Sequence, residues 1–432
     1  MDNTTTYRRS TCRLCDSALL NKVLDFCPSV PVDNYRPRMH KNIDSASYGM
    51  DLYLCQDCGH AQLLDVVAPD ILFGDYIYTS SSSPGLEAHF RELVATIFEK
   101  FSLSPDDLVI DVGCNDGLLL SLFKSKGVRT LGIDPARAAL DAAKLRGLET
   151  FEAFLTAESV NTVVSDHGHA SLVTATNVFS HADDMVGFAG AVHALLKADG
   201  WFVFEVSYLK NLLFSGVWDY VYHEHLAHHS IRPLTSFLRR IGFDLISVQQ
   251  LPIKGGSLRC FAQKTSSPRG LAMEIAELLV EEELQGLYAL ETYRRVAKCR
   301  SELRALTDRL CSSIPKPSVI ASYGASATCT VLSQELGYAH RISFVVDDNG
   351  YRQRTLSPGF LVPVLSCDEL ERLKPQLLII SAWRFRDKIL AQCDKYLQNG
   401  GKIYVPLPTP HIITKTGWES LGLSASAESR DF

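Results

Sequence analysis

The sequence predicts an α/β protein in three parts: a cysteine-bearing N-terminal lobe, a central doubly wound sheet and a second, smaller doubly wound sheet. Two C-x-x-C pairs precede residue 75 in a segment with little helical periodicity. Strand and helix patterns alternate from about residue 86 and again after residue 318, which is typical of parallel sheets with helices on both faces. A chain of 432 residues has room for about three such units. We expect domains at 1–78, 79–250 and 251–415, and a tail at 416–432.

The composition excludes several classes of protein. The chain carries 43 Lys and Arg against 49 Asp and Glu, whereas a protein that grips nucleic acid needs a net basic face. No uninterrupted apolar run reaches the roughly 18 residues of a membrane span, and the polar first ten residues lack the apolar core of a secretory signal. We therefore expect a cytoplasmic protein with no nucleic-acid or membrane partner. The sequence leaves the oligomeric state open.

The N-terminal part carries two cysteine knuckles, Cys12-x-x-Cys15 and Cys55-x-x-Cys58, and Gly59 lets the second turn close. Two facing knuckles make a tetrahedral cage of four sulfurs for Zn²⁺. Doubling the connecting loop costs only about 0.6 kcal/mol, whereas a structural zinc contributes about 10 kcal/mol or more. The alternatives are unligated core cysteines and a redox dithiol, and the latter lacks a thioredoxin-like βαβ context. With four protein ligands, the predicted zinc is structural.

The central part alternates between helices and strands. We expect helices over Glu87–Phe101 and Leu118–Lys126. The expected strands are Leu108–Val112, Val128–Ile133, Leu172–Ala175 and Gly200–Glu205. This order predicts a parallel sheet whose loops at the strand ends carry the functional residues.

The first strand of this part ends in a glycine loop with the sequence Asp-Val-Gly-Cys-Asn-Asp-Gly (111–117). Asp111 would repel a dinucleotide pyrophosphate and favours a cationic ligand. Asp134 ends the next strand, 21 residues after Gly113, where an acidic residue binds the two hydroxyls of a ribose. S-adenosylmethionine combines a ribose with a cationic end and fits this loop better than NAD does; a purely structural turn is the other alternative. The predicted cofactor residues are Asp111, Gly113, Asn115, Asp116, Gly117, Asp134, Glu152 and Asn177.

The last part begins with a charged helical stretch, Ala272–Ser312, which we interpret as a solvated helix pair linking two lobes. Short apolar runs then alternate with helical segments, which predicts a second doubly wound sheet. Its expected strands are Ser318–Ser322, Ile342–Val346, Leu377–Ser381 and Lys402–Val405.

A histidine-rich segment, Tyr-His-Glu-His-Leu-Ala-His-His (222–229), follows the strand that ends near Glu205. A zinc-protease motif starting at His223 would need a histidine at position 227, where the chain has Ala227. A second metal site and loop histidines satisfied by backbone groups remain alternatives. Acid–base chemistry is favoured, because an unperturbed imidazole has a pKa near 6.5.

The order of these motifs resembles that of the sugar C-methyltransferases. Besides the knuckles, the glycine loop and the histidine segment, it includes Asp-Tyr-Ile-Tyr-Thr-Ser (75–80), Asn-Val-Phe-Ser-His (177–181), Gly-Gly-Ser-Leu-Arg (255–259) and Tyr-Gly-Ala (323–325). The resemblance implies a zinc-binding lobe, a Rossmann-like methyltransferase domain and a C-terminal α/β domain that binds a sugar nucleotide. It further implies methylation at C3 of a nucleotide-linked 4-keto-6-deoxy sugar.

A methylated carbon must first lose its proton, and the neighbouring ketone makes this possible by delocalising the charge as an enolate. By resemblance, His225 is the base, Tyr76 and Tyr222 are hydrogen-bonding groups near the sugar, and Glu224 is a partner or a secondary proton carrier. An O- or N-methyltransferase, or a non-catalytic binding protein of the same fold, are the alternative functions. Two departures from the family pattern concern the substrate site. The turn at 324–329 lacks the usual Lys, and His228 and His229 replace aromatic residues.

Overall fold

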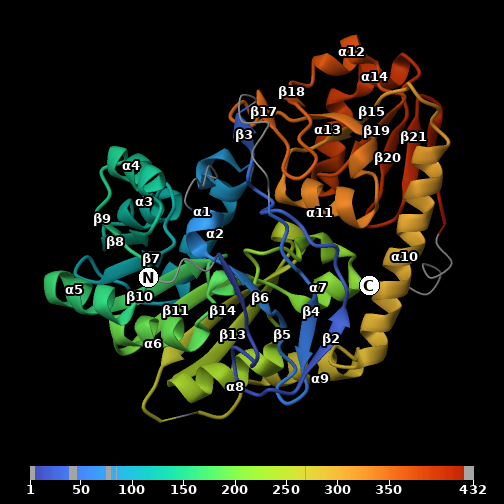
Figure 1. The fold of residues 1–432 in the computed structure, drawn as a ribbon. Helices are drawn as coiled ribbons and strands as arrows, with labels where there is room; N and C mark the ends of the chain where they lie inside the picture. Colours follow the sequence, from blue (N-terminus) through green and yellow to red (C-terminus); the bar gives the residue numbers. More distant parts are fainter. Residues whose placement is uncertain (1–4, 38–45, 74–78, 84, 268, 423–432) are drawn as a thin grey trace.

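The computed structural model describes residues 5–37, 46–73, 79–83, 85–267 and 269–422. Two seven-stranded sheets dominate the fold, and a four-stranded sheet lies with the zinc-binding lobe (Figure 1). The predicted fold class is thus confirmed: a central Rossmann-like sheet, a second doubly wound α/β lobe and an N-terminal lobe with a cysteine cluster.

The N-terminal lobe is built on a small antiparallel sheet whose strand order is β12-β5-β4-β2. Its core strand β4, Leu52–Cys55, pairs with β5, Ala61–Leu63, and with β2, Leu20–Leu24. The fourth strand, β12, Ala227–His228, comes from the histidine segment far along the chain. A separate pair joins β1, Thr6–Arg8, to β6, Asp65–Val67, and helix α1 follows at Pro69–Phe73.

The central sheet has the strand order β13-β14-β11-β10-β7-β8-β9. The strands from β11 to β9 are parallel, and β14 is antiparallel to both β11 and β13. The order reverses between β7 and β10, and ligands bind at such a switch point, beyond the carboxyl ends of the strands. The bounds are β7 Leu108–Val112, β8 Arg129–Asp134, β9 Thr150–Glu152, β10 Ala170–Thr176, β11 Leu196–Ser207, β13 Phe243–Leu251 and β14 Ser257–Lys264.

Helices cover both faces of the central sheet, as its buried strands require. β7 is buried along its whole length, and the predicted strand Leu108–Val112 has the observed bounds. The helices are α2 Leu86–Lys100, α3 Leu118–Lys124, α4 Arg137–Leu145, α5 Ala157–His167, α6 Met185–Leu195, α7 Leu209–Phe214 and α8 Ile231–Ile241. Short 3₁₀ turns are η2 Ser80–Ser82, η3 Phe179–His181, η4 Val217–Tyr220 and η5 Ile253–Gly255.

Two helices, α9 Met273–Leu284 and α10 Leu290–Ser312, connect the central sheet to the C-terminal lobe (Figure 1). The helix pair was predicted, but it is less solvated than its charge suggests. α10 buries Tyr293, Val296 and Leu303, and it contacts β2 of the N-terminal lobe. Buried Glu282 of α9 accepts hydrogen bonds from the backbone N–H groups of Ile231 and Arg232, and it thereby caps α8.

The C-terminal sheet has the strand order β18-β16-β15-β19-β20-β21-β22, with the first five strands parallel. Its strands are β15 Ile320–Tyr323, β16 Ile342–Val346, β18 Val364–Leu365, β19 Leu377–Ile380, β20 Ile403–Val405, β21 His411–Thr414 and β22 Gly417–Ser420. Its helices are α11 Ala327–Glu335, α12 Glu369–Leu373, α13 Arg386–Gln392 and α14 Asp394–Gln398, and short turns are η6 Ala339–Arg341 and η7 Trp383–Phe385.

Pairings and ion pairs cross the predicted domain boundaries. β14 lies beyond residue 250 and yet belongs to the central sheet, and β22 lies in the segment predicted as a tail. β3, Arg36–Pro37, pairs with β17, Thr355–Leu356, of the C-terminal lobe.

Among the described helices, none is both long and apolar enough to cross a membrane.

Candidate active site

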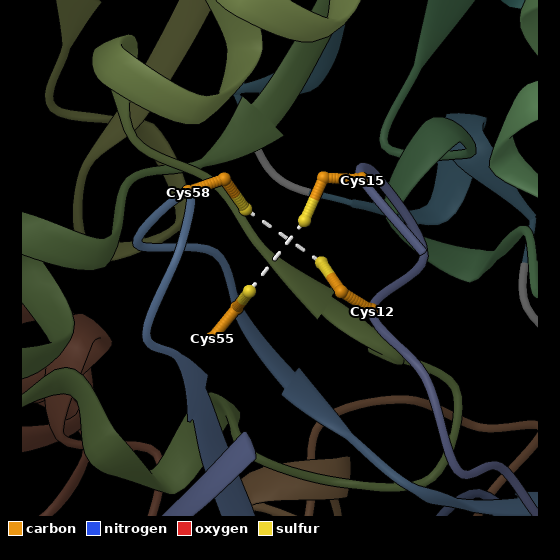
Figure 2. Close-up of side chains that lie close together, drawn as sticks. All are labelled: Cys12, Cys15, Cys55 and Cys58. Atoms are coloured by element: carbon orange, nitrogen blue, oxygen red, sulfur yellow. Dashed lines mark hydrogen bonds between the residues drawn. The ribbon is translucent and has the colours of Figure 1, made fainter. Parts of the chain in front are cut away.

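The four predicted zinc ligands lie together, with their sulfur atoms pointing toward one another (Figure 2). The Sγ atoms of Cys12 and Cys58 are 3.6 Å apart, and so are those of Cys15 and Cys55. Each short contact joins one knuckle to the other, and a tetrahedral zinc–thiolate site with bonds of about 2.3 Å places its sulfurs about 3.8 Å apart. Gly59 closes its turn at φ +82°. The geometry fits Zn²⁺, and four thiolates leave no open coordination position.

The zinc lobe also holds the histidine segment in place. β5, which follows the second knuckle, pairs with β12 through Ala61 and His228. The N–H of Leu63 donates to the carbonyl of Leu226, directly after His225. The N-terminal lobe therefore supports the loop that carries the predicted base.

A cavity of about 1330 Å³ opens at the carboxyl edge of the central sheet. All three lobes line it: Asp33 from the N-terminal lobe, Gly113 and His225 from the central part, and Arg352 and Arg384 from the C-terminal lobe. The glycine loop and the histidine segment, which are about 110 residues apart in the sequence, thus face one space. Its size suits two ligands rather than one, because typical small-molecule pockets measure about 300–1,000 Å³.

The glycine loop is shaped for close approach of a ligand. Gly113 has φ +70°, and a Cβ there would lie 2.3 Å from Cγ2 of Val178. Beneath it, Asp111 is buried and accepts a hydrogen bond of 2.7 Å from the Thr174 hydroxyl. Burial raises the pKa of Asp111 to about 7, and the nearby charge of Asp134 adds to the shift. A cation placed against this carboxylate would relieve the cost of its burial.

Asp134 ends β8 and lines the cavity. Its carboxylate accepts hydrogen bonds from the backbone N–H groups of Asn115, at 2.9 Å, and Ala136, at 2.8 Å. These bonds fix the orientation of the carboxylate and leave lone pairs for the hydroxyls of a ribose. Asn115 and Asn177 line the same cavity, both with positive φ.

Three other predicted cofactor residues point elsewhere in the described structure. Asp116 accepts hydrogen bonds from Ser81 and thereby anchors η2. Gly117 packs against Ala143 of α4 and against Leu148, which follows that helix; a Cβ at Gly117 would lie 2.2 Å from Leu148 Cδ1. Glu152 is exposed at the end of β9, and the residues after it, Ala153–Leu155, line the cavity instead.

A backbone carbonyl and two neighbouring rings contact the imidazole of His225. Its Nδ1 lies 2.9 Å from the Tyr220 carbonyl oxygen. A carbonyl only accepts, so Nδ1 carries the proton and Nε2 keeps its lone pair. The ring centroid lies 4.1 Å from that of Tyr222 and 5.3 Å from that of His181. Burial lowers the pKa of His225 to about 4, with the charge of Lys254 adding to the shift, and the ring is therefore neutral near pH 7.

The Tyr220 carbonyl, rather than the carboxyl of Glu224, is the hydrogen-bond partner of His225 Nδ1. The buried carboxyl of Glu224 lines the cavity close to Asp33 and Arg352. Burial, with the charge of Asp33 adding, raises the pKa of Glu224 well above its usual range, although Arg352 opposes the shift. The buried site therefore favours the protonated form of Glu224 more than water does. Tyr76 lies outside the described residues.

Several residues that line the cavity were not among the predicted site residues. His181 follows β10 in the Asn-Val-Phe-Ser-His motif, and its place after a strand end was a usable signal. The other pairs join distant parts of the chain. Arg352 binds Asp33 at 2.9 Å, and Arg384 binds buried Asp219 at 2.6 and 3.0 Å. No sequence spacing indicates such pairs.

Comparisons with known families cover most of the chain. Residues 12–73 match a zinc binding domain, 86–248 match a methyltransferase domain, and 252–408 match a C-methyltransferase C-terminal domain. The C-methyltransferase NovU of Streptomyces niveus is 32% identical over 369 residues, which cover 85% of this chain and 88% of that protein. The chain belongs to the C-methyltransferase family.

More distant relatives match the methyltransferase region. A ubiquinone biosynthesis O-methyltransferase of Burkholderia thailandensis is 28% identical over 167 residues, which are 34% of this chain and 68% of that protein. Among solved structures, the magnesium protoporphyrin IX methyltransferase of Synechocystis covers 42% of this chain and 80% of its own, at 14% identity and a TM-score of 0.33. Family membership establishes an S-adenosylmethionine-dependent methyltransferase with a zinc-binding N-terminal lobe.

Proposed function

We propose that this C-methyltransferase methylates a carbon next to the C4 ketone of a nucleotide-linked 4-keto-6-deoxy sugar, and that His225 is the base. The resemblance favours C3, and C5 also flanks the ketone. One observation carries the proposal: a neutral imidazole, with Nδ1–H bonded to the Tyr220 carbonyl and Nε2 available, lines the same cavity as the cofactor loop. Methylation of an oxygen or nitrogen atom breaks no carbon–hydrogen bond, whereas methylation of carbon requires a base that removes the proton from that carbon.

In this proposal His225 Nε2 removes the proton α to the ketone. The electron pair of the C–H bond enters the new C=C bond, and the carbonyl π pair moves onto oxygen. S-adenosylmethionine, when bound, would supply the methyl group that the enolate carbon takes, and the electron pair of the broken carbon–sulfur bond would stay on sulfur, leaving S-adenosylhomocysteine. Tyr222 and Tyr76 orient the sugar, and Glu224, whose pKa is raised by burial, donates or relays a proton.

The cofactor occupies the central side of the cavity. Gly113 gives room for close approach, Asp111 faces the cationic end, and Asp134 binds the ribose hydroxyls. Asn115 and Asn177 complete this wall. Asp116 and Gly117 support this wall through their contacts with Ser81 and Leu148, and Glu152 lies exposed at the end of β9, next to the cavity-lining residues Ala153–Leu155.

The nucleotide part of the substrate occupies the C-terminal side. Ser326, Ala327 and Arg352 line the cavity there, beyond the carboxyl ends of β15 and β16. Arg352 is placed to offset the phosphate charge, and its pairing with Asp33 sets its orientation. The segments 79–250 and 251–415 would then bind the methyl donor and the sugar nucleotide respectively.

The proposal is tested by incubating nucleotide-linked 4-keto-6-deoxy sugars with the enzyme in deuterated water, first without the methyl donor. We expect deuterium at one carbon α to the ketone and, when the donor is added, a methyl group at the same carbon, located by NMR. His225→Asn should reduce both reactions by about 10³-fold and leave donor affinity within about twofold.

The matched control is His167→Asn, on the surface helix α5, which should behave as the wild type. Methyl transfer to oxygen or nitrogen without exchange would instead indicate an O- or N-methyltransferase. Failure to bind the donor in calorimetry would indicate a non-catalytic protein. Full exchange by His225→Asn would remove His225 from the role of base.

A further inference from the structure

Lys254 adopts a backbone conformation that a lysine rarely takes. Its φ of 54° and ψ of 26° lie in the left-handed region, where the Cβ atom crowds the following carbonyl oxygen. It precedes Gly255 and Gly256, which open the Gly-Gly-Ser-Leu-Arg motif and also have positive φ. Strained residues of this kind persist where the surrounding structure holds them, and they concentrate at functional sites.

The surrounding structure does hold this loop. A Cβ at Gly256 would lie 2.2 Å from Cγ of Asn211, and one at Gly255 would lie 2.7 Å from Nε of Arg384. The N–H of Tyr208 donates to the Gly256 carbonyl at 3.2 Å. The backbone is therefore pressed against α7 and the C-terminal lobe, and Lys254 cannot relax without moving both.

The topology places Lys254 at the reacting edge of the central sheet. β14 is antiparallel to β11, and its first residue, Ser257, pairs with Ser207, the last residue of β11. The loop before β14 thus lies beside the carboxyl ends of the parallel strands, and Lys254 lines the cavity together with His225. Its positive charge contributes to lowering the pKa of both His225 and His181.

Formation of the proposed enolate requires a cationic or hydrogen-bond-donating group beside the ketone oxygen. A base whose pKa is about 4 removes a proton from carbon only if the resulting enolate oxygen is strongly stabilised. An ammonium group on a short, rigidly held loop provides a compact charge without reorganisation during the reaction.

We propose that Lys254 is a catalytic residue whose ammonium group stabilises the negative charge that develops on the C4 oxygen when His225 removes the neighbouring proton, a role that rests on the proposed function. Lys254 keeps its own proton throughout. When the new carbon–carbon bond forms, the lone pair on oxygen re-forms the C=O bond and the C=C pair becomes the bond to the methyl group. The carbon–sulfur pair stays on sulfur, so the enolate charge is neutralised and the ketone is restored.

The test measures deuterium exchange without methyl donor, steady-state kcat and KM, and melting temperature for three variants. Lys254→Met keeps the chain length but removes the charge, Lys254→Arg keeps the charge, and Lys254→Gly also removes the backbone strain. The matched control is Lys374→Gly, because Lys374 is an exposed lysine with left-handed φ of 44° outside the cavity.

We expect Lys254→Met and Lys254→Gly to lose exchange and kcat by at least about 100-fold, with KM changed little. Lys254→Arg should recover about tenfold. Lys254→Gly should melt no lower than the wild type, which would show that the strain serves activity rather than stability. Lys374→Gly should keep full activity.

Wild-type exchange rates in Lys254→Met would overturn the inference while leaving the proposed function intact. A raised KM with unchanged kcat would also overturn it, because the lysine would then bind the substrate equally before and during the reaction. Absence of exchange in the wild type would overturn the proposed function itself, and the role of Lys254 with it.

Discussion

The two seven-stranded sheets share the same arrangement of a glycine turn and an aspartate at the carboxyl ends of their parallel strands. In the central sheet, the N–H of Gly113 donates to Ile133 O, and Asp134 accepts from two backbone N–H groups. In the C-terminal sheet, the N–H of Gly324 donates to Val346 O. There Asp347 accepts from the N–H groups of Ala325, at 2.5 Å, and Asn349, at 2.7 Å. A glycine turn after one strand is locked to an aspartate after the next.

The two glycine turns differ in the charge of the residue that lies two positions before the glycine. Asp111 lies two residues before Gly113 and is buried. At the corresponding position before Gly324 stands Ser322, which is neutral and bonded to the Ser381 hydroxyl at 2.6 Å. On the C-terminal side, Arg352 lines the cavity and donates to the Ala325 carbonyl at 2.5 Å. In the proposed function, the first arrangement binds the cationic methyl donor and the second binds the anionic nucleotide.

The largest effect should follow from removing the buried charge of the central loop. Asp111→Asn should weaken binding of S-adenosylmethionine by about 100-fold, or ~2.7 kcal/mol, because the amide cannot compensate the cationic end of the ligand. Titration calorimetry at pH 8 gives the comparison. Ser322→Ala, the matched variant of the other loop, should leave this affinity unchanged. Equal affinities in the two variants would contradict the charge difference between the loops.

Local patterns in the sequence predicted the parts of the site that depend on local structure. The strand before the glycine loop, the four zinc ligands and Ile342–Val346 have the predicted positions. Contacts between distant segments were not predictable. The pairing of β12 with β5 and the ion pair of Asp219 with Arg384 depend on how the lobes meet. The sequence favoured a side chain, Glu224, as the partner of His225, because a backbone carbonyl leaves no mark in a sequence.

The two glycines should differ by a smaller amount, about 1–2 kcal/mol of unfolding free energy. A Cβ at Gly324 would lie 2.3 Å from the Cβ of Ala382 and 3.0 Å from its backbone nitrogen, at φ +103°. At Gly113 the obstacle is the side chain of Val178, which is able to rotate. Gly324→Ala should therefore cost about 3 kcal/mol of unfolding free energy and Gly113→Ala about 1–2 kcal/mol. Urea unfolding measures both, and the reverse order would show that the C-terminal turn is the more adaptable one.

The smallest effect is a pH dependence of donor binding. Since burial raises the pKa of Asp111 to about 7, the carboxyl of the empty protein is largely neutral at pH 6 and charged at pH 8. A cationic ligand prefers the carboxylate, so affinity for S-adenosylmethionine should rise several-fold between these values. In the ligand-free protein, the effect of pH on stability is opposite to its effect on donor affinity. Ionising this buried group lowers stability as pH rises through 7, and Asp111→Asn should melt higher than the wild type at pH 8. A wild-type affinity as flat with pH as that of Asp111→Asn would mean that the loop does not use its buried charge.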